Sequence, residues 1–270
     1  MIIWLKIIFL IIFVDYFNKL KFGIMDRKLV IIPTYNEKEN IEKIIRTVFQ
    51  KEGEFNILIV DDNSPDGTAG IVKKLMEEFP ERLFIKEREG KLGLGTAYIL
   101  GFKWALEQNY DYIFEMDADF SHNPDDLIRL YRACAEGNDV AIGSRYVSGV
   151  NVVNWPMKRI LLSYYASKYV RIVTRIPVRD TTAGFMCYTS RALRAINFDN
   201  IKFTGYAFQI EMKYTVWKLG GKIKEVPIIF YDRTEGTSKM SGSIFGEAVF
   251  GVINLSFRNI KKLHYGFSAS

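Results

Sequence analysis

Cysteine and histidine are scarce in this sequence, and their scarcity excludes several kinds of protein. The chain has two cysteines, Cys134 and Cys187, and two histidines, His122 and His264. They do not have the spacing of a zinc site, and two cysteines cannot build a disulfide framework. A disulfide-rich or zinc-stabilised fold is therefore excluded, and a reducing compartment fits the composition.

Long apolar runs are also missing, apart from one at the N-terminus. Residues 1–14 are apolar except for Lys6. A membrane span needs roughly 20 apolar residues, and no small-residue cleavage site of a signal peptide follows this run. We expect residues 1–24 to be either an interfacial anchor or a translated leader upstream of a start at Met25, with the leader slightly favoured. No later stretch reaches spanning length without charges, so the body of the protein should not cross a bilayer.

The chain has no internal repeat and no low-complexity linker. An apolar content of 49% in 270 residues is enough to bury a sizeable core, which excludes a disordered or fibrous protein. The formal charge of +6 points to an anionic partner, but charge alone does not separate nucleic acid, anionic lipid and phosphorylated substrates. We expect one domain over residues 25–243, and then a C-terminal helix within 244–270 that faces a membrane or packs on the core.

Short β-rich runs alternate with longer runs of helical periodicity from Leu29 onward, which is typical of an α/β fold with a mainly parallel central sheet. The predicted strands span residues 29–32, 56–60, 83–86, 112–116 and 139–143. The predicted helices between them span residues 39–49, 69–79, 96–106 and 124–135, with Asn123 as N-cap of the last. Beyond Tyr146 we expect helices over 158–173, 207–219 and about 244–260, and a strand over 222–230.

Acidic and polar residues directly follow three of these strands. The first strand ends in Pro33-Thr34-Tyr35-Asn36-Glu37, the second in Asp61-Asp62-Asn63-Ser64-Pro65-Asp66-Gly67, and the fourth in Asp117-Ala118-Asp119. Open parallel sheets bind ligands outside the carboxyl ends of their strands, so these side chains should gather at one edge. Crowded carboxylates repel one another unless a cation or hydrogen-bond donors compensate, which makes a metal ion or a nucleotide the expected occupant.

The Asp-Ala-Asp triplet is the sharpest of these features. In an extended segment alternate side chains project to the same side, so Asp117 and Asp119 can bind one hard cation, Mg²⁺ or Mn²⁺, together with ligand hydroxyls. Solvated carboxylates at a strand end are the alternative, because a bare D-x-D is common. For His122, structural hydrogen bonds at a helix entry are favoured over a metal or acid/base role.

Four motifs give the sequence a family resemblance. They are P-T-Y-N-E from Pro33, V-D-D-N-S-P-D-G-T from Val60, K-L-G-L-G-T-A from Lys91 and M-D-A-D-F-S-H from Met116. Their order and spacing resemble those of family 2 glycosyltransferases, and more closely those of the polyprenol- or dolichol-phosphate mannose synthases. The resemblance implies a GT-A Rossmann-like fold and a catalytic subunit without C-terminal transmembrane helices.

The resemblance also implies which residues bind the donor and the metal. The positions that contact the guanosine part of the donor are Pro33, Tyr35, Glu37, Val60 and Asp62. Asp117, Ala118 and Asp119 meet its ribose, its diphosphate and the metal ion. Ser121 stands where some relatives have a metal-facing Gln.

Basic residues match the phosphate-binding positions of the family. Arg145, Arg159 and Ser163 match positions that receive the acceptor phosphate, and Arg233 and Lys239 match a mobile loop that closes over the donor diphosphate. An arginine binds phosphate bidentately and stays charged, and fixed cations offset the repulsion between two phosphate-bearing substrates. Ordinary surface charge is the alternative for each of them.

The reaction implied by the resemblance is an inverting transfer of mannose from GDP-mannose to a polyprenyl phosphate of the dolichyl or undecaprenyl type, with Asp117, Asp119 and Arg145 at the catalytic centre. A phosphate monoester is already largely ionised at neutral pH, so the transfer requires no strong general base. Two alternatives stay open: a hexosyltransferase that uses a UDP-sugar, and a catalytically silent membrane-peripheral scaffold. A dinucleotide-dependent dehydrogenase is disfavoured, because Tyr98 stands where G-x-G-x-x-G requires its third glycine.

A polyprenyl tail costs roughly 0.8 kcal/mol per methylene to remove from a bilayer, so the site has to reach the membrane surface. The predicted helix over 158–173 and the residues before it combine apolar and aromatic side chains with basic ones, as interfacial helices do. These residues are Trp155, Ile160, Leu161, Tyr164, Tyr165 and Tyr169, flanked by Lys158, Arg159, Lys168 and Arg171. We expect a peripheral protein at the cytoplasmic face of the membrane that binds no nucleic acid, with a membrane-anchoring partner protein as a further option.

Overall fold

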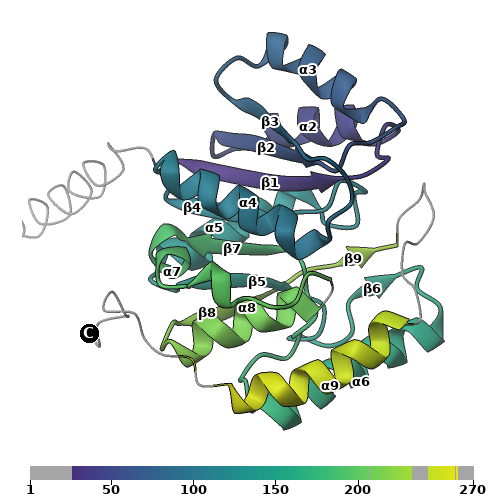
Figure 1. Cartoon of the computed structure of the whole chain (residues 1–270), viewed down its shortest axis with the longest axis vertical. Helices are drawn as coiled ribbons and strands as arrows, with labels where there is room; N and C mark the ends of the chain where they lie inside the picture. Colours follow the sequence, from purple (N-terminus) through teal and green to yellow (C-terminus); the bar gives the residue numbers. More distant parts are fainter. Residues whose placement is uncertain (1–25, 206, 233–242, 259, 261–270) are drawn as a thin grey trace, which may run out of the picture.

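A mainly parallel sheet of seven strands runs through the part of the chain that the computed structural model describes, residues 26–205, 207–232, 243–258 and 260. Its strands, in spatial order, are β3 (Leu83–Glu87), β2 (Phe55–Asp61), β1 (Lys28–Thr34), β4 (Tyr112–Glu115), β7 (Met186–Thr189), β5 (Val140–Ser144) and β8 (Ile223–Pro227) (Figure 1). Neighbouring strands are parallel except at β7, which is antiparallel to both β4 and β5. The strands predicted before Tyr146 are confirmed. The sequence does not predict β7, because an apolar run of this length is too short to show the alternation that distinguishes a strand from a helix or a loop.

The strand predicted over 222–230 is divided in the structure. β8 ends at Pro227, and the N–H of Ile228 donates the last hydrogen bond toward β5, to the Ser144 carbonyl at 3.1 Å. The chain then forms β9 (Phe230–Tyr231), which pairs in parallel with β6 (Val152–Val153). This small sheet lies beyond the carboxyl ends of the central strands (Figure 1). The break at Pro227 therefore carries the chain to the edge where the predicted site residues gather.

The helices α2 (Ile41–Phe49), α3 (Thr68–Glu78) and α5 (Leu127–Ala135) cover one face of the sheet. Side-chain alternation in β1 directs Val30 and Ile32 to this face, where they pack with the apolar stripe of α2. The 3-10 turn η1 (Pro124–Asp126) precedes α5, and the side chain of Asn123 accepts the N–H of Asp125 at 3.0 Å. The predicted helices on this face are confirmed, although Asn123 caps the 3-10 turn and not the α-helix itself.

The helices α4 (Leu94–Glu107) and α8 (Ala207–Lys218) cover the other face, which receives Leu29 and Ile31 of β1. The shorter α7 (Ser190–Arg194) and η2 (Phe198–Asn200) pack beside α4. α4 and α8 approach closely at Gly95, where a Cβ atom would lie 2.7 Å from the Phe208 side chain and 2.9 Å from the Phe203 carbonyl. Gly95 is therefore needed for close packing of two helices.

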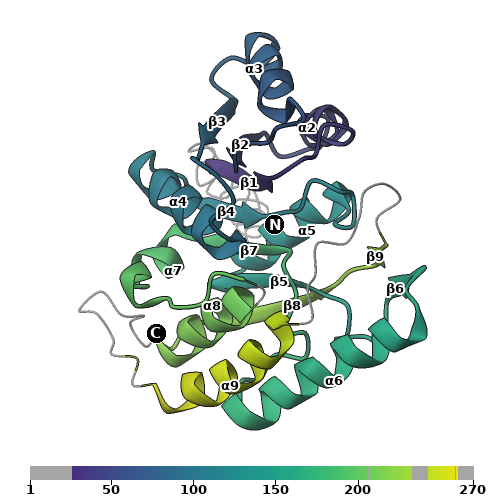
Figure 2. The same ribbon diagram turned by 45° about the vertical axis from the view of Figure 1, so that its right-hand side comes forward.

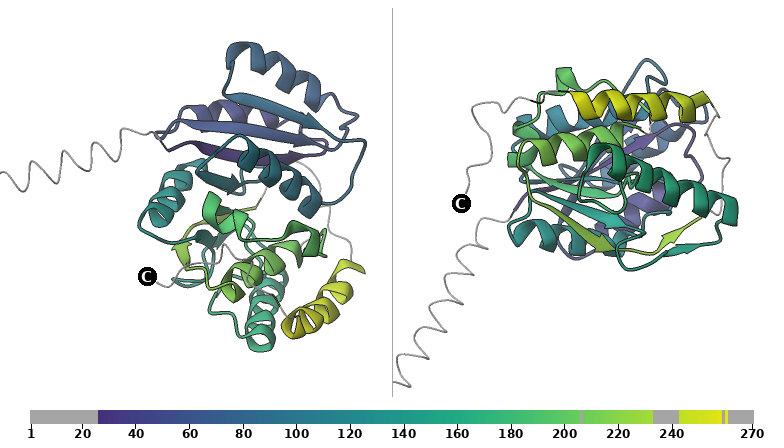
Figure 3. Two further views of the ribbon diagram at one scale, coloured as in Figure 1. Left: turned by 60° about the vertical axis from the view of Figure 1, so that its left-hand side comes forward. Right: turned by 90° about the horizontal axis from the view of Figure 1, so that it is seen from below.

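The helices α6 (Met157–Thr174) and α9 (Ser243–Phe257) lie side by side outside α8 (Figures 1 and 2). The right panel of Figure 3 shows α6, α8 and α9 gathered on the same side of the sheet. α9 buries Val252 and Leu255, while Phe250 is 73% exposed and Phe257 is 84% exposed. Its described side chains thus combine a core-packed face with an exposed apolar one.

Within the described ranges, no helix combines the length and the apolar character that crossing a membrane requires. Residues 1–24 lie outside those ranges. The two interpretations of that segment, an interfacial anchor and a translated leader, therefore stay predictions.

Candidate active site

The carboxyl ends of β1, β2 and β4 lie next to one another at one edge of the sheet (Figure 1). In the register of the sheet, Thr34 pairs with Asp61 of β2, and Ile31 pairs with Glu115 of β4. The predicted donor residues share this edge, and they are Pro33, Tyr35, Glu37, Val60, Asp62, Asp117, Ala118 and Asp119. The topology therefore brings them together, and their contacts with a nucleotide stay predictions.

Side chains of the second motif support the loop after β1. Asp61 is fully buried and accepts hydrogen bonds from the N–H and the hydroxyl of Ser64, at 2.8 and 2.7 Å. The N–H of Asn36 donates to the Ser64 hydroxyl at 3.0 Å, and the N–H of Glu37 donates to the Thr68 hydroxyl at 3.1 Å. The first two motifs are therefore one structural unit, in which Asp61 holds the loop in place.

Asp62 has an ion-pair partner that sequence reasoning misses. Arg88 Nε donates to Asp62 Oδ1 at 2.6 Å, and Arg88 Nη1 donates to the Thr96 hydroxyl of α4, also at 2.6 Å. Burial raises the pKa of Asp62, and Arg88 opposes that rise. Arg88 follows β3 in the run K-E-R-E-G, where no signal separates it from an ordinary surface charge, so only the fold reveals its role.

The Asp-Ala-Asp segment bends, which differs from the extended conformation expected for it. The bend begins at Ala118, and Phe120 has a left-handed φ of +60°. The Asp117 side chain is 42% exposed. Asp119 is only 8% exposed, and its Oδ1 accepts the N–H of Ser121 at 3.0 Å. The Ser121 N–H thus turns back onto the Asp119 carboxylate within the bend, and the two acids of the pair differ in exposure.

The His122 side chain is hydrogen-bonded to the backbone of this segment. Its Nδ1 accepts the N–H of Asp117 at 3.1 Å, and its ring stacks on Phe185 with centroids 4.9 Å apart. Burial lowers the pKa of His122 to about 4, so the imidazole is neutral at neutral pH. These contacts agree with the structural interpretation of His122.

The chemistry of the segment suits a hard divalent cation. The described residues contain no group of three or more His, Cys, Asp or Glu side chains arranged around one ion. Asp117 and Asp119 supply carboxylate oxygens, and the Ser121 hydroxyl is buried without a hydrogen-bond partner among the described residues. An oxygen-only set of this kind fits Mg²⁺ or Mn²⁺, which typically completes its shell with water and substrate phosphates.

Arg145, directly after β5, is held by a buried acid. Its side chain is 7% exposed, its Nε donates to Asp180 Oδ2 at 2.7 Å, and its Nη2 donates to Asp180 Oδ1 at 2.6 Å. Nη2 also donates to the Thr182 hydroxyl at 2.8 Å. Burial on its own raises the pKa of a carboxyl, but the Arg145 guanidinium outweighs this and holds the pKa of Asp180 below its ordinary value. Sequence reasoning misses Asp180, which lies in a loop before β7.

Arg159 and Arg145 converge on one aromatic ring. The guanidinium carbon of Arg159 lies 4.0 Å from the centroid of Trp155, and that of Arg145 lies 5.5 Å from it. Ser163 follows Arg159 by one turn of α6. Burial raises the pKa of Tyr146, and Arg145 and Ser163 oppose that rise, so Ser163 is close to the Tyr146 phenol. The structure therefore brings the three predicted acceptor residues around Trp155 and Tyr146, and their binding of phosphate stays a prediction.

The two predicted residues of the mobile loop, Arg233 and Lys239, lie outside the described residues. Asp232, which precedes them, accepts a hydrogen bond from Arg159 Nη1 at 2.6 Å. Asp232 therefore lies beside Arg159, one of the predicted acceptor residues.

Polar side chains are also buried under the Asp-Ala-Asp segment. Glu115 and Lys213 are fully buried, and Gln209 is 2% exposed. Lys213 Nζ donates to the carbonyls of Ala183 and Gln209, at 2.6 and 3.1 Å. Burial raises the pKa of Glu115 to about 8 and lowers the pKa of Lys213 to about 8. Sequence reasoning misses the pair of Glu115 and Lys213, because these residues lie on β4 and α8, which only the fold brings together.

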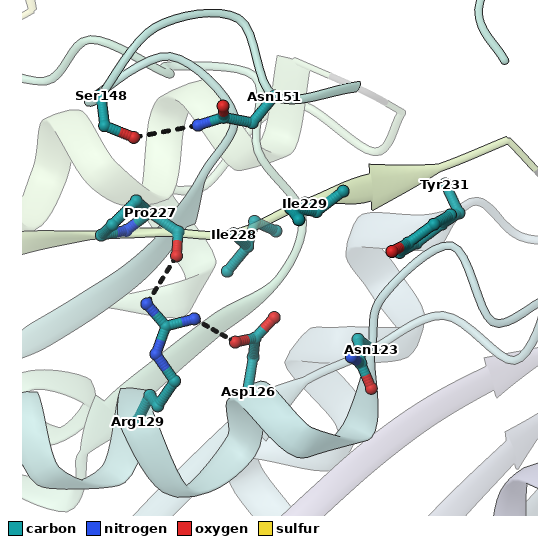
Figure 4. A pocket seen from close by; sticks show the side chains of 9 residues that line it. All are labelled: Asn123, Asp126, Arg129, Ser148, Asn151, Pro227, Ile228, Ile229 and Tyr231. Atoms are coloured by element: carbon teal, nitrogen blue, oxygen red, sulfur yellow. Dashed lines mark hydrogen bonds and ion pairs between the residues drawn. The ribbon is translucent and has the colours of Figure 1, made fainter. Parts of the chain in front are cut away.

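A cavity of ≈ 450 Å³ lies on the α5 side of the same edge (Figure 4). Its lining residues are Asn123, Asp126, Arg129, Ser148, Asn151, Pro227, Ile228, Ile229 and Tyr231. Arg129 Nη2 donates to the Pro227 carbonyl at 2.7 Å and is ion-paired with Asp126 (Figure 4). These polar groups bond to one another, and none of the predicted site residues lines the cavity.

Two comparisons of sequence identify relatives of this chain. A profile of the family described as glycosyl transferase family 2 matches residues 29–198. Polyprenol monophosphomannose synthase of Mycolicibacterium smegmatis is 44% identical over 232 residues, which cover 86% of this chain and 88% of the relative. Undecaprenyl-phosphate mannosyltransferase of Micrococcus luteus is 46% identical over 226 residues, which cover 84% of this chain and 92% of the relative.

Solved structures share the fold. Glucosyl-3-phosphoglycerate synthase from Mycobacterium tuberculosis, in complex with Mn²⁺, UDP and glucosyl-3-phosphoglycerate, aligns with a TM-score of 0.60 at 16% identity, covering 85% of this chain and 78% of that one. A mannosyltransferase from Pyrobaculum calidifontis, in complex with GDP-Man and Mn²⁺, aligns with a TM-score of 0.56 at 17% identity, covering 88% of this chain and 66% of that one. At this identity the similarity concerns the fold alone, and it confirms the expected GT-A fold.

Proposed function

The chain belongs to glycosyl transferase family 2, and from this premise we propose that it transfers mannose from GDP-mannose to a polyprenyl phosphate. The observation that carries the proposal is its identity of 44% and 46%, across most of its length, with two enzymes named for mannosyl transfer to polyprenol and undecaprenyl phosphate. The acidic edge at β1, β2 and β4 and the basic cluster after β5 support it, because the reaction needs one site for a nucleotide diphosphate and one for a lipid phosphate.

On the donor side, the loops after β1 and β2 would bind the guanosine and the Asp-Ala-Asp segment would bind the ribose and diphosphate. Asp117, Asp119 and the Ser121 hydroxyl are the groups that would hold Mg²⁺ or Mn²⁺. The bound cation would act as a Lewis acid that neutralises charge on the departing diphosphate. Arg233 and Lys239, from the loop that follows β9, would add positive charge on the same phosphates.

On the acceptor side, Arg145, Arg159 and Ser163 would orient the lipid phosphate. One of its oxygens attacks C1 of the mannose, the bond from C1 to the GDP oxygen breaks on the opposite face, and the anomeric centre inverts. The phosphate is largely ionised at neutral pH, so no side chain has to remove a proton. Asp180 keeps the Arg145 guanidinium fixed, which favours catalysis through preorganised charge.

The surface of α6 and α9 would carry the enzyme to the bilayer. Leu161, Tyr165 and Ile172 of α6 are 47%, 58% and 68% exposed, and Phe250 and Phe257 of α9 are exposed to a still greater extent. Basic residues of α6 border this surface, as in helices that lie in a membrane interface. A peripheral enzyme at the cytoplasmic face fits this arrangement, with or without a membrane-anchoring partner protein.

The test is transfer from radiolabelled GDP-mannose, GDP-glucose, UDP-glucose and UDP-N-acetylglucosamine to undecaprenyl phosphate in vesicles, with analysis of the lipid product. We expect metal-dependent formation of mannosyl lipid from GDP-mannose, and competition by GDP but not by UDP. Transfer from a UDP-sugar alone would replace the proposal with the hexosyltransferase alternative. Absence of transfer from every donor, with folded protein and added Mn²⁺, would favour the scaffold.

A further inference from the structure

Two aromatic rings that contact Arg145 and Arg159 each carry a buried hydrogen-bond donor without a partner among the described residues. Tyr146 is 4% exposed, and its hydroxyl forms no hydrogen bond with the described residues. The indole Nε1 of Trp155 is likewise buried and unpaired among them. The Ser163 hydroxyl lies near the Tyr146 phenol but outside hydrogen-bonding geometry. Unpaired buried polar atoms are costly, so each of these needs an explanation.

The neighbouring arginines leave donors of their own. Asp180 and Thr182 engage Nε and Nη2 of Arg145, and Nη1 makes no hydrogen bond to a described residue. The guanidinium carbon of Arg145 lies 5.2 Å from the ring centroid of Tyr146 and 5.5 Å from the ring centroid of Trp155. The guanidinium carbon of Arg159 lies 4.0 Å from the same Trp155 centroid. Two cationic side chains therefore contact the two rings that carry the unpaired donors.

We propose that the Tyr146 hydroxyl and the Trp155 indole N–H donate hydrogen bonds to the acceptor phosphate, and that Asp180 is a positioning residue that orients Arg145 for the same phosphate. The inference rests on the proposed function, since it names further ligands of the lipid phosphate. It extends the predicted set of Arg145, Arg159 and Ser163.

The chemistry of the cluster selects a phosphate over a sugar or water. An indole N–H and a guanidinium can only donate, so their common ligand has to be an acceptor. The nearby acceptors, Asp180 and Asp232, are already bonded by Arg145 and Arg159. A sugar hydroxyl would find few acceptors for its own hydrogen here, whereas an ionised phosphate offers three oxygens that only accept and that can take charge-assisted hydrogen bonds from an arginine.

The test measures binding of farnesyl phosphate, a soluble isoprenyl phosphate, to the full chain by calorimetry in the presence of GDP and Mn²⁺. Tyr146→Phe and Trp155→Phe remove the proposed donors and keep an aromatic ring. Tyr112→Phe, at the amino end of β4, and Trp104→Phe, in α4 beside Phe84, are matched controls away from this edge. We expect each donor variant to raise the dissociation constant about ten- to a hundredfold, and both controls to bind as the wild type does.

Asp180→Asn provides a readout that a purely structural role would not move. As a positioning residue, Asp180 should affect the KM for the lipid phosphate while the KM for GDP-mannose stays unchanged. A purely structural role would lower only the fraction of active enzyme, and so kcat alone. A change in kcat alone would therefore contradict the positioning role.

The outcomes also separate this inference from the proposed function. If the wild type transfers mannose while Tyr146→Phe and Trp155→Phe bind farnesyl phosphate within twofold of the wild type, the inference is wrong and the function stands. If the wild type neither binds farnesyl phosphate nor transfers mannose, the proposed function fails and the inference fails with it.

Discussion

Asp117 and Asp119 lie in different surroundings although a single residue separates them. Asp117 is half-exposed, and Asp119 is nearly buried, with one carboxylate oxygen engaged by the Ser121 N–H. A cation between them would meet one nearly buried carboxylate and one that is open to solvent. Such a site suits a cation that takes further oxygens from the phosphates of a substrate.

Asp119→Ala should lower mannosyl transfer at least about a hundredfold, because a preorganised group for the charge on the leaving diphosphate is lost. Initial rates with GDP-mannose measure the effect, and thermal unfolding checks that the fold persists. Asp125→Ala is the matched control, since Asp125 is an exposed acid of the same region that pairs with Lys51 at 2.6 Å. A wild-type rate in the Asp119 variant would contradict the assigned role.

Asp180→Asn should reduce the free energy of unfolding at pH 7 by about 3 kcal/mol or more, because Arg145 remains buried without its counter-charge. The pKa of Asp180 is held below its ordinary value in the folded protein. Its stabilising contribution is therefore present above about pH 4 and is lost as the pH falls through the lower, folded value. Denaturant unfolding at several pH values measures the difference in free energy of unfolding between the wild type and the Asp180→Asn variant. It should shrink below about pH 4, and a constant difference across that range would argue against the ion pair as its source.

At the scale of elements, the approach of α4 to α8 depends on a residue without a side chain. Gly95→Ala should destabilise the protein by about 1–3 kcal/mol, since the added methyl group would meet Phe208 and the Phe203 carbonyl within 3 Å. Gly70→Ala in α3 is the control, because a Cβ atom there meets nothing within 4 Å. That change should stabilise the helix by up to about 1 kcal/mol. Chemical denaturation of both variants tests the contrast, and equal effects would contradict it.

The exposed faces of α6 and α9 should determine binding to membranes. Ile172→Ser combined with Phe257→Ser should weaken binding to vesicles at least about tenfold, because two exposed apolar side chains can no longer enter the bilayer. Leu100→Ser, which removes an exposed apolar residue of α4, is the control and should bind as the wild type does. Co-sedimentation with vesicles measures binding, and transfer to farnesyl phosphate in solution should be unchanged. Undiminished vesicle binding by the double variant would place the membrane contact elsewhere.

At the scale of the whole molecule, the predicted donor and acceptor residues share one edge of the sheet but occupy different parts of it. The predicted donor residues follow β1, β2 and β4, and Arg145 follows β5, with the antiparallel β7 between β4 and β5. α6 and α9 lie beyond β8, on the acceptor side (Figure 1). A water-soluble donor and a membrane-bound acceptor would thus approach the same centre from different directions.

Chelation should stop transfer without unfolding the molecule. Among the described residues no group of three metal-binding side chains surrounds one point, so we expect the cation to serve the reaction and not the fold. EDTA should abolish mannosyl transfer, added Mn²⁺ or Mg²⁺ should restore it, and the melting temperature should shift by no more than about 2 °C. A large fall in melting temperature on chelation would show that the metal also stabilises the fold.

The sequence by itself determined the early strands and helices, the gathering of acidic residues at one edge of the sheet, and the family. Each of these depends on local patterns: hydrophobic periods in single elements, and motifs such as M-D-A-D-F-S-H within a few residues. The order of strands then follows general rules for parallel sheets. A local pattern can be recognised in a few consecutive residues, so the elements and motifs that depend on it can be predicted from the sequence.

Only the tertiary structure decided how β7 enters the sheet, that Asp180 holds Arg145, and that two arginines converge on Trp155. Arg145 and Asp180 are 35 residues apart, and a sequence position carries no signal for which distant charge will be buried beside it. The strand over 222–230 divides for the same reason, since β9 leaves the central sheet to pair with β6. Pairings between distant segments depend on how the whole chain packs, and no short stretch of sequence shows which distant segments will meet.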